Sequence, residues 1–228
     1  GDSMISVLFD LDGTLTDSAE GILKSVRYAL EKKGVPIPDE ETLQLFIGPP
    51  IVDSLQDHCG MTADEAAETY CYFKERYETV GKFENKVYTD VDRMLVTLRQ
   101  TNAYVAVATA KPEHLAREIL DHFDLTKYFD VIKGADQKRG VVHKEDILAE
   151  ALDELREMGK NRTKKSITGW YMVGDRKYDM EAAHLHGCKA VAVTYGYGTV
   201  EELEAAGADY LCADPSEVIL NIAVDTLL

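Results

Sequence analysis

The sequence predicts an α/β protein in which a parallel-sheet core carries an inserted helical cap domain. Three observations predict it: a short apolar run near the N-terminus, purely helical patterns up to about residue 88, and alternating helices and strands from residue 90 onward. Alternation of this kind is typical of βα units and a parallel sheet. The first strand most simply joins the same sheet. We therefore predict a discontinuous core of residues 1–17 and 88–228 and a cap of residues 18–87.

The N-terminal run at 5–9 is short, apolar and rich in β-forming residues, which favours a buried parallel strand ending at Asp10. Apolar residues at helical spacing then predict four helices, at about 18–34, 39–46, 51–58 and 62–81. The turn Gly48-Pro49-Pro50 separates the second helix from the third, because proline lacks the amide donor that a continuing helix needs. The insert is therefore expected to be all helical.

From Asp90 onward, short apolar strands alternate with amphipathic helices. We expect helices at 91–100, 112–123, about 145–158, 179–186, near 200–206 and from 216 to the C-terminus. Strands are expected at 104–108, 129–133, 170–173 and 190–193. Because ligands of open α/β sheets bind at the carboxyl ends of the strands, the residues that follow each strand are the first candidates for a functional site.

Composition and charge narrow the range of partners. The 228 residues are 45% hydrophobic and 29% charged, and 25 Lys and Arg against 41 Asp and Glu leave a formal charge of −16. A protein this acidic repels phosphate backbones and anionic lipids, so we expect neither a nucleic-acid polymer nor a membrane as partner. The four cysteines show no CxxC spacing, which argues against a zinc or redox motif and fits a reduced, cytoplasmic location. We expect a monomer or weak dimer.

Two pairs of acidic residues follow predicted strands. Asp10 and Asp12 lie two residues apart, and Asp175 and Asp179 lie four apart, on one face if a helix begins there. Close carboxylates repel each other unless a divalent cation or a shared proton intervenes, so the pairs suggest a magnesium site. The alternatives are a polar turn for the first pair and an acidic helix N-terminus for the second.

A hydroxyl and a lysine lie between these two pairs. Thr109 ends a predicted strand before a helix that starts with proline, where exposed backbone amides favour an anion. The alternative interpretation is that Thr109 only caps the helix that follows. Lys144 lies near the start of the next predicted helix. The alternative interpretation is that Lys144 is a solvated surface charge.

The order of these features resembles that of the haloacid dehalogenase superfamily of phosphatases. The string Phe-Asp-Leu-Asp-Gly-Thr-Leu-Thr-Asp-Ser at 9–18 resembles the first motif, Thr109 the second, and the Gly-Asp-Arg-Lys-Tyr-Asp string at 174–179 the fourth. Ala110 stands where relatives often carry Asn. Lys144 is the best positional match to the third motif, with Lys138 or Arg139 as a rival. The resemblance implies a Rossmann-like core with a helical cap after the first motif.

The resemblance also implies roles for these residues. Asp10 would attack phosphorus, and Asp12 would act as general acid and base; Asp12 argues for phosphoryl rather than carbon–halogen chemistry. Thr109, Ala110 and Lys144 would contact the phosphate. Mg²⁺ would be bound by Asp10, the backbone carbonyl of Asp12, and Asp175, with Asp179 in support.

The cap turn Gly48-Pro49-Pro50 resembles the specificity loop of phosphoglycolate phosphatase-like and nucleotide 5′-phosphatase-like members. The expected function is magnesium-dependent hydrolysis of a small phosphorylated metabolite through an aspartyl-phosphate, as in phosphoglycolate phosphatases. A nucleotide 5′-phosphatase and a phosphosugar mutase of the β-phosphoglucomutase type remain alternatives, because mutases share the same core residues. A silent phosphate-binding module is a further alternative, which the intact acid set disfavours.

Overall fold

A six-stranded parallel sheet forms the centre of the computed structural model, which describes residues 3–162 and 166–227. Residues 1–2, 163–165 and 228, which the predicted core includes, lie outside the described residues. The strand order is β5-β4-β1-β6-β7-β8. The strands are β1 (Ser3–Phe9), β4 (Ala103–Pro112), β5 (Val131–Ala135), β6 (Ser166–Gly174), β7 (Lys189–Val193) and β8 (Tyr210–Cys212). Since β1 lies between β4 and β6, Asp10 leaves the sheet at its centre.

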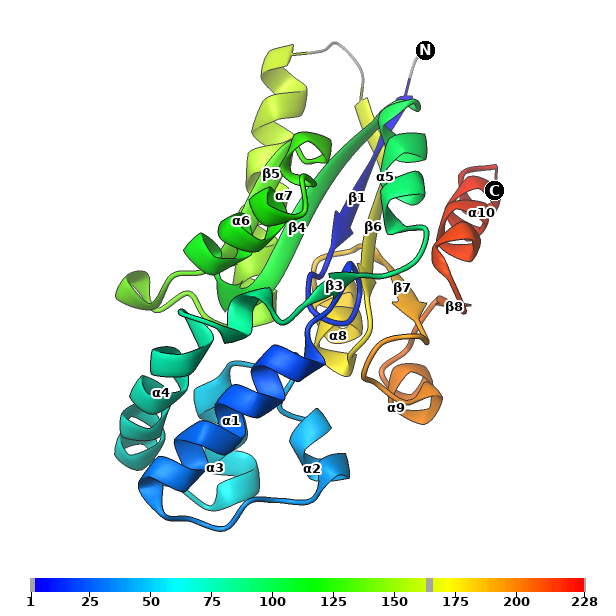
Figure 1. The fold of residues 1–228 in the computed structure, drawn as a ribbon. Helices are drawn as coiled ribbons and strands as arrows, with labels where there is room; N and C mark the ends of the chain where they lie inside the picture. The colour runs from blue at the N-terminus through cyan, green and yellow to red at the C-terminus, as the bar shows by residue number, and fades with distance from the viewer. Residues whose placement is uncertain (1–2, 163–165, 228) are drawn as a thin grey trace.

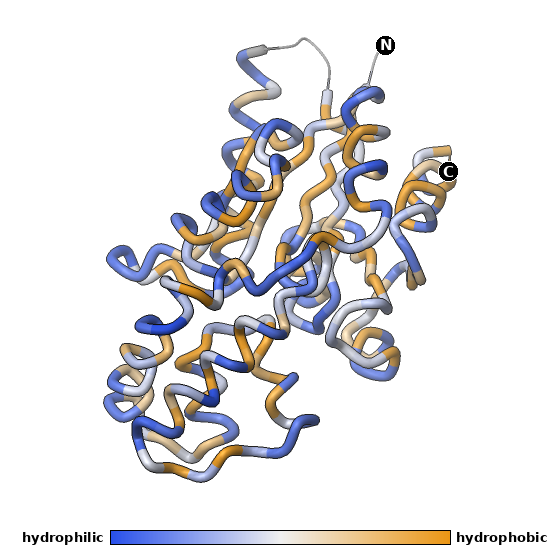
Figure 2. The backbone as a smooth tube through the Cα atoms, viewed as in Figure 1, coloured by the Kyte–Doolittle hydropathy of each residue, from blue (hydrophilic) through white to orange (hydrophobic). Residues whose placement is uncertain are grey.

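Helices cover both faces of the sheet, which gives the predicted Rossmann-like α/β core (Figure 1). Side chains alternate along β1: Val7 and Phe9 pack into one hydrophobic core, and Leu8 packs into the other. The first core is completed by α5 (Val91–Arg99), α6 (Glu113–His122) and α10 (Pro215–Thr226). The second is completed by α7 (Lys144–Arg162), α8 (Lys177–Leu185) and α9 (Val200–Ala205). Figure 2 shows this pattern as apolar colour along the strands and alternating colours along the helices.

The helical insert has a hydrophobic core of its own. It contains α1 (Ala19–Lys33), α2 (Glu40–Gln44), α3 (Ile51–Cys59) and α4 (Ala63–Tyr77). Leu30, Phe46, Leu55 and Phe73 are among its buried side chains. Figure 1 shows these helices together at one end of the sheet, beyond the carboxyl end of β1. The insert is thus placed next to the acidic residues that follow the strands.

The two connections between the insert and the sheet lie side by side. They pair as an antiparallel ribbon of β2 (Thr16–Asp17) and β3 (Lys86–Val87), with the short 3₁₀ helix Gly81–Phe83 just before it. A Cβ on Gly21 would lie 1.8 Å from the carbonyl oxygen of Gly81, so only glycine allows α1 to approach this segment so closely. The division of the chain into a cap of residues 18–87 and a core stays a prediction. The ribbon of β2 and β3 lies at the two predicted boundaries between them.

The sequence reasoning missed three strands and shortened others. β2, β3 and β8 contain two or three residues each, too few for a pattern of period two to emerge. β4 continues four residues beyond the predicted end, to Pro112, through a register shift against β5. Residues 109–111 therefore lie in an irregular strand end. No helix among the described residues has the length and apolar character needed to cross a bilayer.

Candidate active site

Asp10 begins the site, directly after β1 at the centre of the sheet. Its amide donates a hydrogen bond to the carbonyl of Val173 (2.9 Å), so the β1 register continues through it against β6. Its carboxylate Oδ1 accepts hydrogen bonds from the Leu11 amide and from Lys144 Nζ, both at 2.8 Å. The side chain is buried. Asp10 is therefore held in one orientation with its second oxygen, Oδ2, free of hydrogen bonds to other described residues.

Asp175 and Asp179 meet Asp10 from the end of β6 and the first turn of α8. One carboxylate oxygen from each of the three residues lies within 4.8 Å of the others, and all three side chains are buried. Asp175 accepts hydrogen bonds from the Thr14 hydroxyl (3.2 Å) and the Tyr197 amide (2.9 Å). Asp179 Oδ2 accepts from the backbone amides of residues 175 and 176 and so stabilises the turn that presents Asp175.

The ammonium group of Lys144 contacts this cluster. Besides Asp10, its Nζ lies 3.0 Å from Asp179 Oδ1, without the angle of a hydrogen bond, and donates to the carbonyl of Ala108 at 2.9 Å. Burial opposes its charge, yet the carboxylates of Asp10 and Asp179 raise the pKa of Lys144 above the ordinary lysine value. Lys144 is therefore charged at neutral pH, at the start of α7 as the sequence predicts.

The cluster carries more negative charge than Lys144 can balance. Burial and the neighbouring Asp179 raise the pKa of Asp10 to about 7, against the opposing effect of Lys144. Burial and the carboxylates of Asp10 and Asp179 likewise raise the pKa of Asp175 well above its usual range. Three buried carboxylates that share the single ammonium of Lys144 fit a divalent cation with oxygen ligands.

Two glycines make room for Asp175. Gly13 has a φ of +84°, and a Cβ there would lie 2.1 Å from Asp175 Oδ2. A Cβ on Gly196 would lie 2.3 Å from Asp175 Cβ. Gly196 is a further part of the site, which only the fold brings to Asp175.

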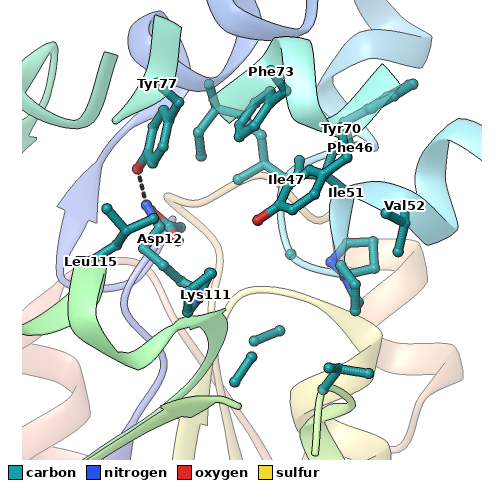
Figure 3. Close-up of a pocket in the computed structure, with 18 of the residues that line it drawn as sticks. Asp12, Phe46, Ile47, Ile51, Val52, Tyr70, Phe73, Tyr77, Lys111 and Leu115 are labelled. Atoms are coloured by element: carbon teal, nitrogen blue, oxygen red, sulfur yellow. Dashed lines mark hydrogen bonds and ion pairs between the residues drawn. The ribbon is translucent and has the colours of Figure 1, made fainter. Parts of the chain in front are cut away.

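Asp12 is not part of the three-carboxylate cluster, and its charge is balanced by a different lysine, Lys111. Asp12 Oδ1 accepts hydrogen bonds from the Ser18 hydroxyl (2.6 Å) and from Lys111 Nζ (2.9 Å). Lys111 also donates to the hydroxyl of Tyr77, at the end of α4 in the insert (Figure 3). Burial raises the pKa of Tyr77 to about 12, although Lys111 opposes this, so the phenol is neutral. Sequence reasoning missed Lys111, whose position two residues after Thr109 was its only signal.

The other predicted phosphate contacts are also at this edge. Thr109 is buried in the irregular end of β4, where its hydroxyl accepts a hydrogen bond from the Lys111 amide at 3.1 Å. Ala110 lines the neighbouring cavity. Lys138 lies in the 3₁₀ helix Gln137–Arg139, is exposed and lines a different hollow. The structure thus places Lys144, and not its rival Lys138, against Asp10.

Arg176 connects the core to the loop that precedes the cap turn. Its Nη1 donates to the carbonyls of Leu45 (3.2 Å) and Ile47 (2.6 Å), while its Nε and Nη2 bind the carboxylate of Glu202. A Cβ on Gly48, whose φ is +130°, would lie 3.0 Å from the Arg176 side chain. Arg176 was not predicted, because nothing in the sequence links it to residues some 130 positions away.

A cavity lies between the insert and the strand ends (Figure 3). Asp12 and Lys111 line its inner end, and Gly48, Pro49 and Pro50 lie in its wall, as do aromatic and aliphatic residues of α3 and α4. The predicted specificity residues therefore face the same space as the predicted general acid.

Comparison with known proteins supplies the family. The sequence profile of haloacid dehalogenase-like hydrolases matches residues 7–193, which include every acidic residue of the site. A 5'-nucleotidase of Pseudomonas aeruginosa is 35% identical over 209 residues, 92% of this chain and 91% of the relative. A phosphoglycolate phosphatase of Vibrio parahaemolyticus is 30% identical over 96% of both chains.

Other relatives have different names. The tyrosine-protein kinase PtkA of Mycobacterium tuberculosis is 38% identical over 90% of this chain and 67% of its own length. Among solved structures, a predicted phosphatase from Clostridium acetobutylicum superimposes with a TM-score of 0.88 at 37% identity, covering 97% of this chain and 99% of the other. The names of the relatives differ, whereas the family profile and the fold agree. The chain belongs to the haloacid dehalogenase-like hydrolase family, as its four motifs predicted.

Proposed function

We propose that this chain hydrolyses phosphomonoesters of small metabolites through a covalent intermediate on Asp10. The chain is a phosphatase of its family, and the proposal concerns the roles of its residues, its metal and its substrate. The contact between Lys144 and Asp10 at 2.8 Å, within a cluster of three buried carboxylates, carries it. A buried ammonium beside one carboxylate of such a cluster suits an anionic phosphoryl group better than a neutral substrate.

In the first step, a carboxylate oxygen of Asp10 attacks phosphorus, and the bond from phosphorus to the leaving-group oxygen breaks. Asp12 donates its proton to that oxygen, so an alcohol leaves. In the second step, Asp12 takes a proton from water, whose oxygen attacks phosphorus. The bond to Asp10 then breaks and inorganic phosphate is released. Lys144 balances charge on the phosphoryl oxygens, and the hydroxyl of Thr109 and the backbone of Ala110 bind them.

The metal we propose is Mg²⁺, bound by Asp10, the backbone carbonyl of Asp12, and Asp175, with Asp179 in support. When bound, it supplies Lewis-acid stabilisation of the phosphoryl charge. Asp179 orients the Asp175 turn through two backbone amides. Lys144 lowers the pKa of Asp10 against the effect of burial and so favours the ionised nucleophile. The excess negative charge of the cluster is the observation that supports a divalent cation here.

The experiment that tests the proposal is a panel of phosphate esters assayed with Mg²⁺ and with a chelator. We expect phosphate release that needs Mg²⁺ and that Asp10→Asn reduces by many orders of magnitude, because the amide cannot attack phosphorus. Parent activity in purified Asp10→Asn protein, or full activity after exhaustive chelation, contradicts the proposal.

A phosphosugar mutase is the second candidate, because the same core residues serve it. Incubating glucose 1-phosphate and glucose 6-phosphate and measuring isomer against inorganic phosphate separates the two reactions. The net charge of −16 supports a small-molecule partner over a nucleic-acid polymer or a membrane. A cytoplasmic location and a monomer or weak dimer stay predictions.

A further inference from the structure

The loop that leads from α2 into the cap turn cannot pair all of its carbonyl groups locally. After α2, the amides of Leu45 and Ile47 donate to the carbonyls three residues back, as in a 3₁₀ turn. This pattern cannot continue beyond Gly48, because Pro49 and Pro50 have no amide hydrogen. Buried carbonyls of the loop therefore need donors from another part of the fold.

Arg176 supplies two of these donors from the end of β6. Its Nη1 donates to the carbonyl of Ile47 at 2.6 Å and to that of Leu45 at 3.2 Å. Its side chain is only 3% exposed. Gly48 allows the loop to lie directly against this side chain, since its φ is +130° and a Cβ there would lie 3.0 Å from Arg176 Cγ. The guanidinium is thus built into the contact between the insert and the sheet.

A second contact fixes the direction of the Arg176 side chain. Its Nε and Nη2 donate to the two carboxylate oxygens of Glu202 in α9, at 2.8 and 3.2 Å. A guanidinium and a carboxylate that are joined by two parallel hydrogen bonds restrict each other's orientation. Burial of the arginine without such a charged partner would be strongly unfavourable. Glu202 therefore balances the buried charge and holds Nη1 toward the loop.

The backbone of Arg176 belongs to the turn that presents Asp175. Its amide donates to Asp179 Oδ2 at 3.1 Å, and the carbonyl of the preceding residue, Asp175, accepts from the Gly198 amide at 3.1 Å. The main chain of Arg176 is therefore fixed to the catalytic edge of the sheet, while its side chain is fixed to the loop that enters the cap turn. One residue thus relates the position of that turn to the position of the carboxylate cluster.

We propose that Arg176 is a positioning residue, which holds the cap turn Gly48-Pro49-Pro50 in the wall of the cavity so that the leaving group meets a preformed surface. Arg176 acts through the loop and not on the phosphoryl group, because the bonds of its guanidinium go to Glu202 and to the loop carbonyls. Its effect on substrates rests on the proposed function, in which Asp12 and the cap turn border the same space. Its effect on the loop does not.

Amide hydrogen exchange of the metal-free protein, measured by mass spectrometry, tests the effect on the loop. In Arg176→Met we expect the amides of residues 45–54 to exchange at least about tenfold faster, with β1 and β4 unchanged, because the loop loses two hydrogen bonds. Lys82→Met is the matched control: it removes a 2.6 Å ion pair between the insert and Glu118 of α6, and it should leave residues 45–54 unchanged. Unchanged exchange at residues 45–54 in Arg176→Met, an equal increase across the whole insert, or an equal increase in Lys82→Met overturns the proposal.

Two milder variants carry the same test if Arg176→Met does not fold. Arg176→Lys keeps the charge, but its donors lie on one nitrogen and cannot serve Glu202 and the loop together. Glu202→Gln keeps the guanidinium and removes the charged partner that orients it. Each variant should raise exchange at residues 45–54 by about threefold or more, the loss expected for part of this hydrogen bonding. Unchanged exchange in both variants contradicts the proposal.

Kinetics distinguishes positioning of the cap turn from an effect on the Asp175 turn. Phenyl phosphate, whose leaving group would enter the cavity, is compared with acetyl phosphate at saturating Mg²⁺. We expect Arg176→Lys to lower kcat/KM for phenyl phosphate relative to acetyl phosphate by about fivefold, through KM, and to keep kcat for acetyl phosphate within about twofold of the parent. An equal loss on both esters through kcat assigns the effect to Asp175 and overturns the proposal. If the parent hydrolyses neither ester, the proposed function fails, while hydrogen exchange still decides the role of Arg176.

Discussion

Lys144 Nζ donates a 2.8 Å hydrogen bond to Asp10 Oδ1, joining the N-terminus of α7 to the end of β1 across 134 residues of sequence. Both side chains are buried. A buried ion pair of this kind contributes little net stability, because desolvation offsets the attraction. In the proposed reaction the role of Lys144 is electrostatic: the ammonium opposes the rise in the Asp10 pKa, which favours the ionised nucleophile, and it faces the phosphoryl group.

Lys144→Met should lower kcat by roughly 10² to 10³-fold, because removing one charge-stabilising donor has an effect of that order. Steady-state phosphate release with the best ester of the panel is the measurement, and circular dichroism checks the fold. Lys138→Met is the matched control and should retain parent activity, since Lys138 is exposed and away from Asp10. Loss in Lys138→Met with retention in Lys144→Met would reverse the assignment of the phosphate-neutralising lysine.

Asp12→Asn should slow esters with poor leaving groups most. General acid catalysis supplies about 10² to 10⁴-fold, and this help matters least when the leaving alkoxide is already stable. The measurement compares an alkyl and an aryl phosphate for parent and variant. Ser18 and Lys111 can still donate to the amide oxygen, so the side chain should keep its place. An equal loss for both esters would contradict the general-acid role.

The metal-free protein should lose stability as pH rises. The folded-state pKa of Asp10 is about 7, above its unfolded value near 3.8, so the folded state binds more protons between these limits. The free energy of unfolding therefore falls with increasing pH through this window, by on the order of 4 kcal/mol from Asp10 alone, and the Asp10 contribution levels off above about pH 7.

Thermal unfolding of chelated protein from pH 5 to 8 measures this effect. Mg²⁺ should reduce the slope, because it binds the ionised carboxylates of the folded state. Asp10→Asn provides the control, since it removes the Asp10 contribution and should make the chelated profile less steep, while Asp175, whose pKa is also raised, keeps its own contribution. Identical pH profiles for the chelated parent and Asp10→Asn would show that Asp10 does not titrate in this range.

Replacing both prolines of the cap turn, Pro49→Gly with Pro50→Gly, should change substrate preference more than basal turnover. The turn lines the cavity, and a flexible glycine turn must be ordered at each encounter at a cost of about 1 kcal/mol or more per residue. The readout is relative kcat/KM among phosphoglycolate, nucleotide and sugar phosphates, with acetyl phosphate as the minimal substrate. A uniform decrease across all four would indicate that the turn only supports the fold of the insert.

The acidic part of the site was predictable from local sequence. Asp10 and Asp175 each follow a short apolar strand, and parallel strands bring their carboxyl ends to one edge of the sheet, so two distant motifs had to meet there. Asp179 was predictable for the same reason, since it lies one helical turn from Asp175. The α/β class and the helical insert likewise followed from periodicity, which reports local conformation.

The remaining relationships were decided only by the tertiary structure. Lys111 pairs with Asp12 and Tyr77, and Arg176 binds the carbonyl of Ile47, through contacts between segments that no local pattern relates. From the sequence alone, a lysine or arginine with a buried partner cannot be distinguished from one that is a solvated surface charge. The packing of the insert on the strand ends buries both residues, and burial is what forces each of them to take a specific partner.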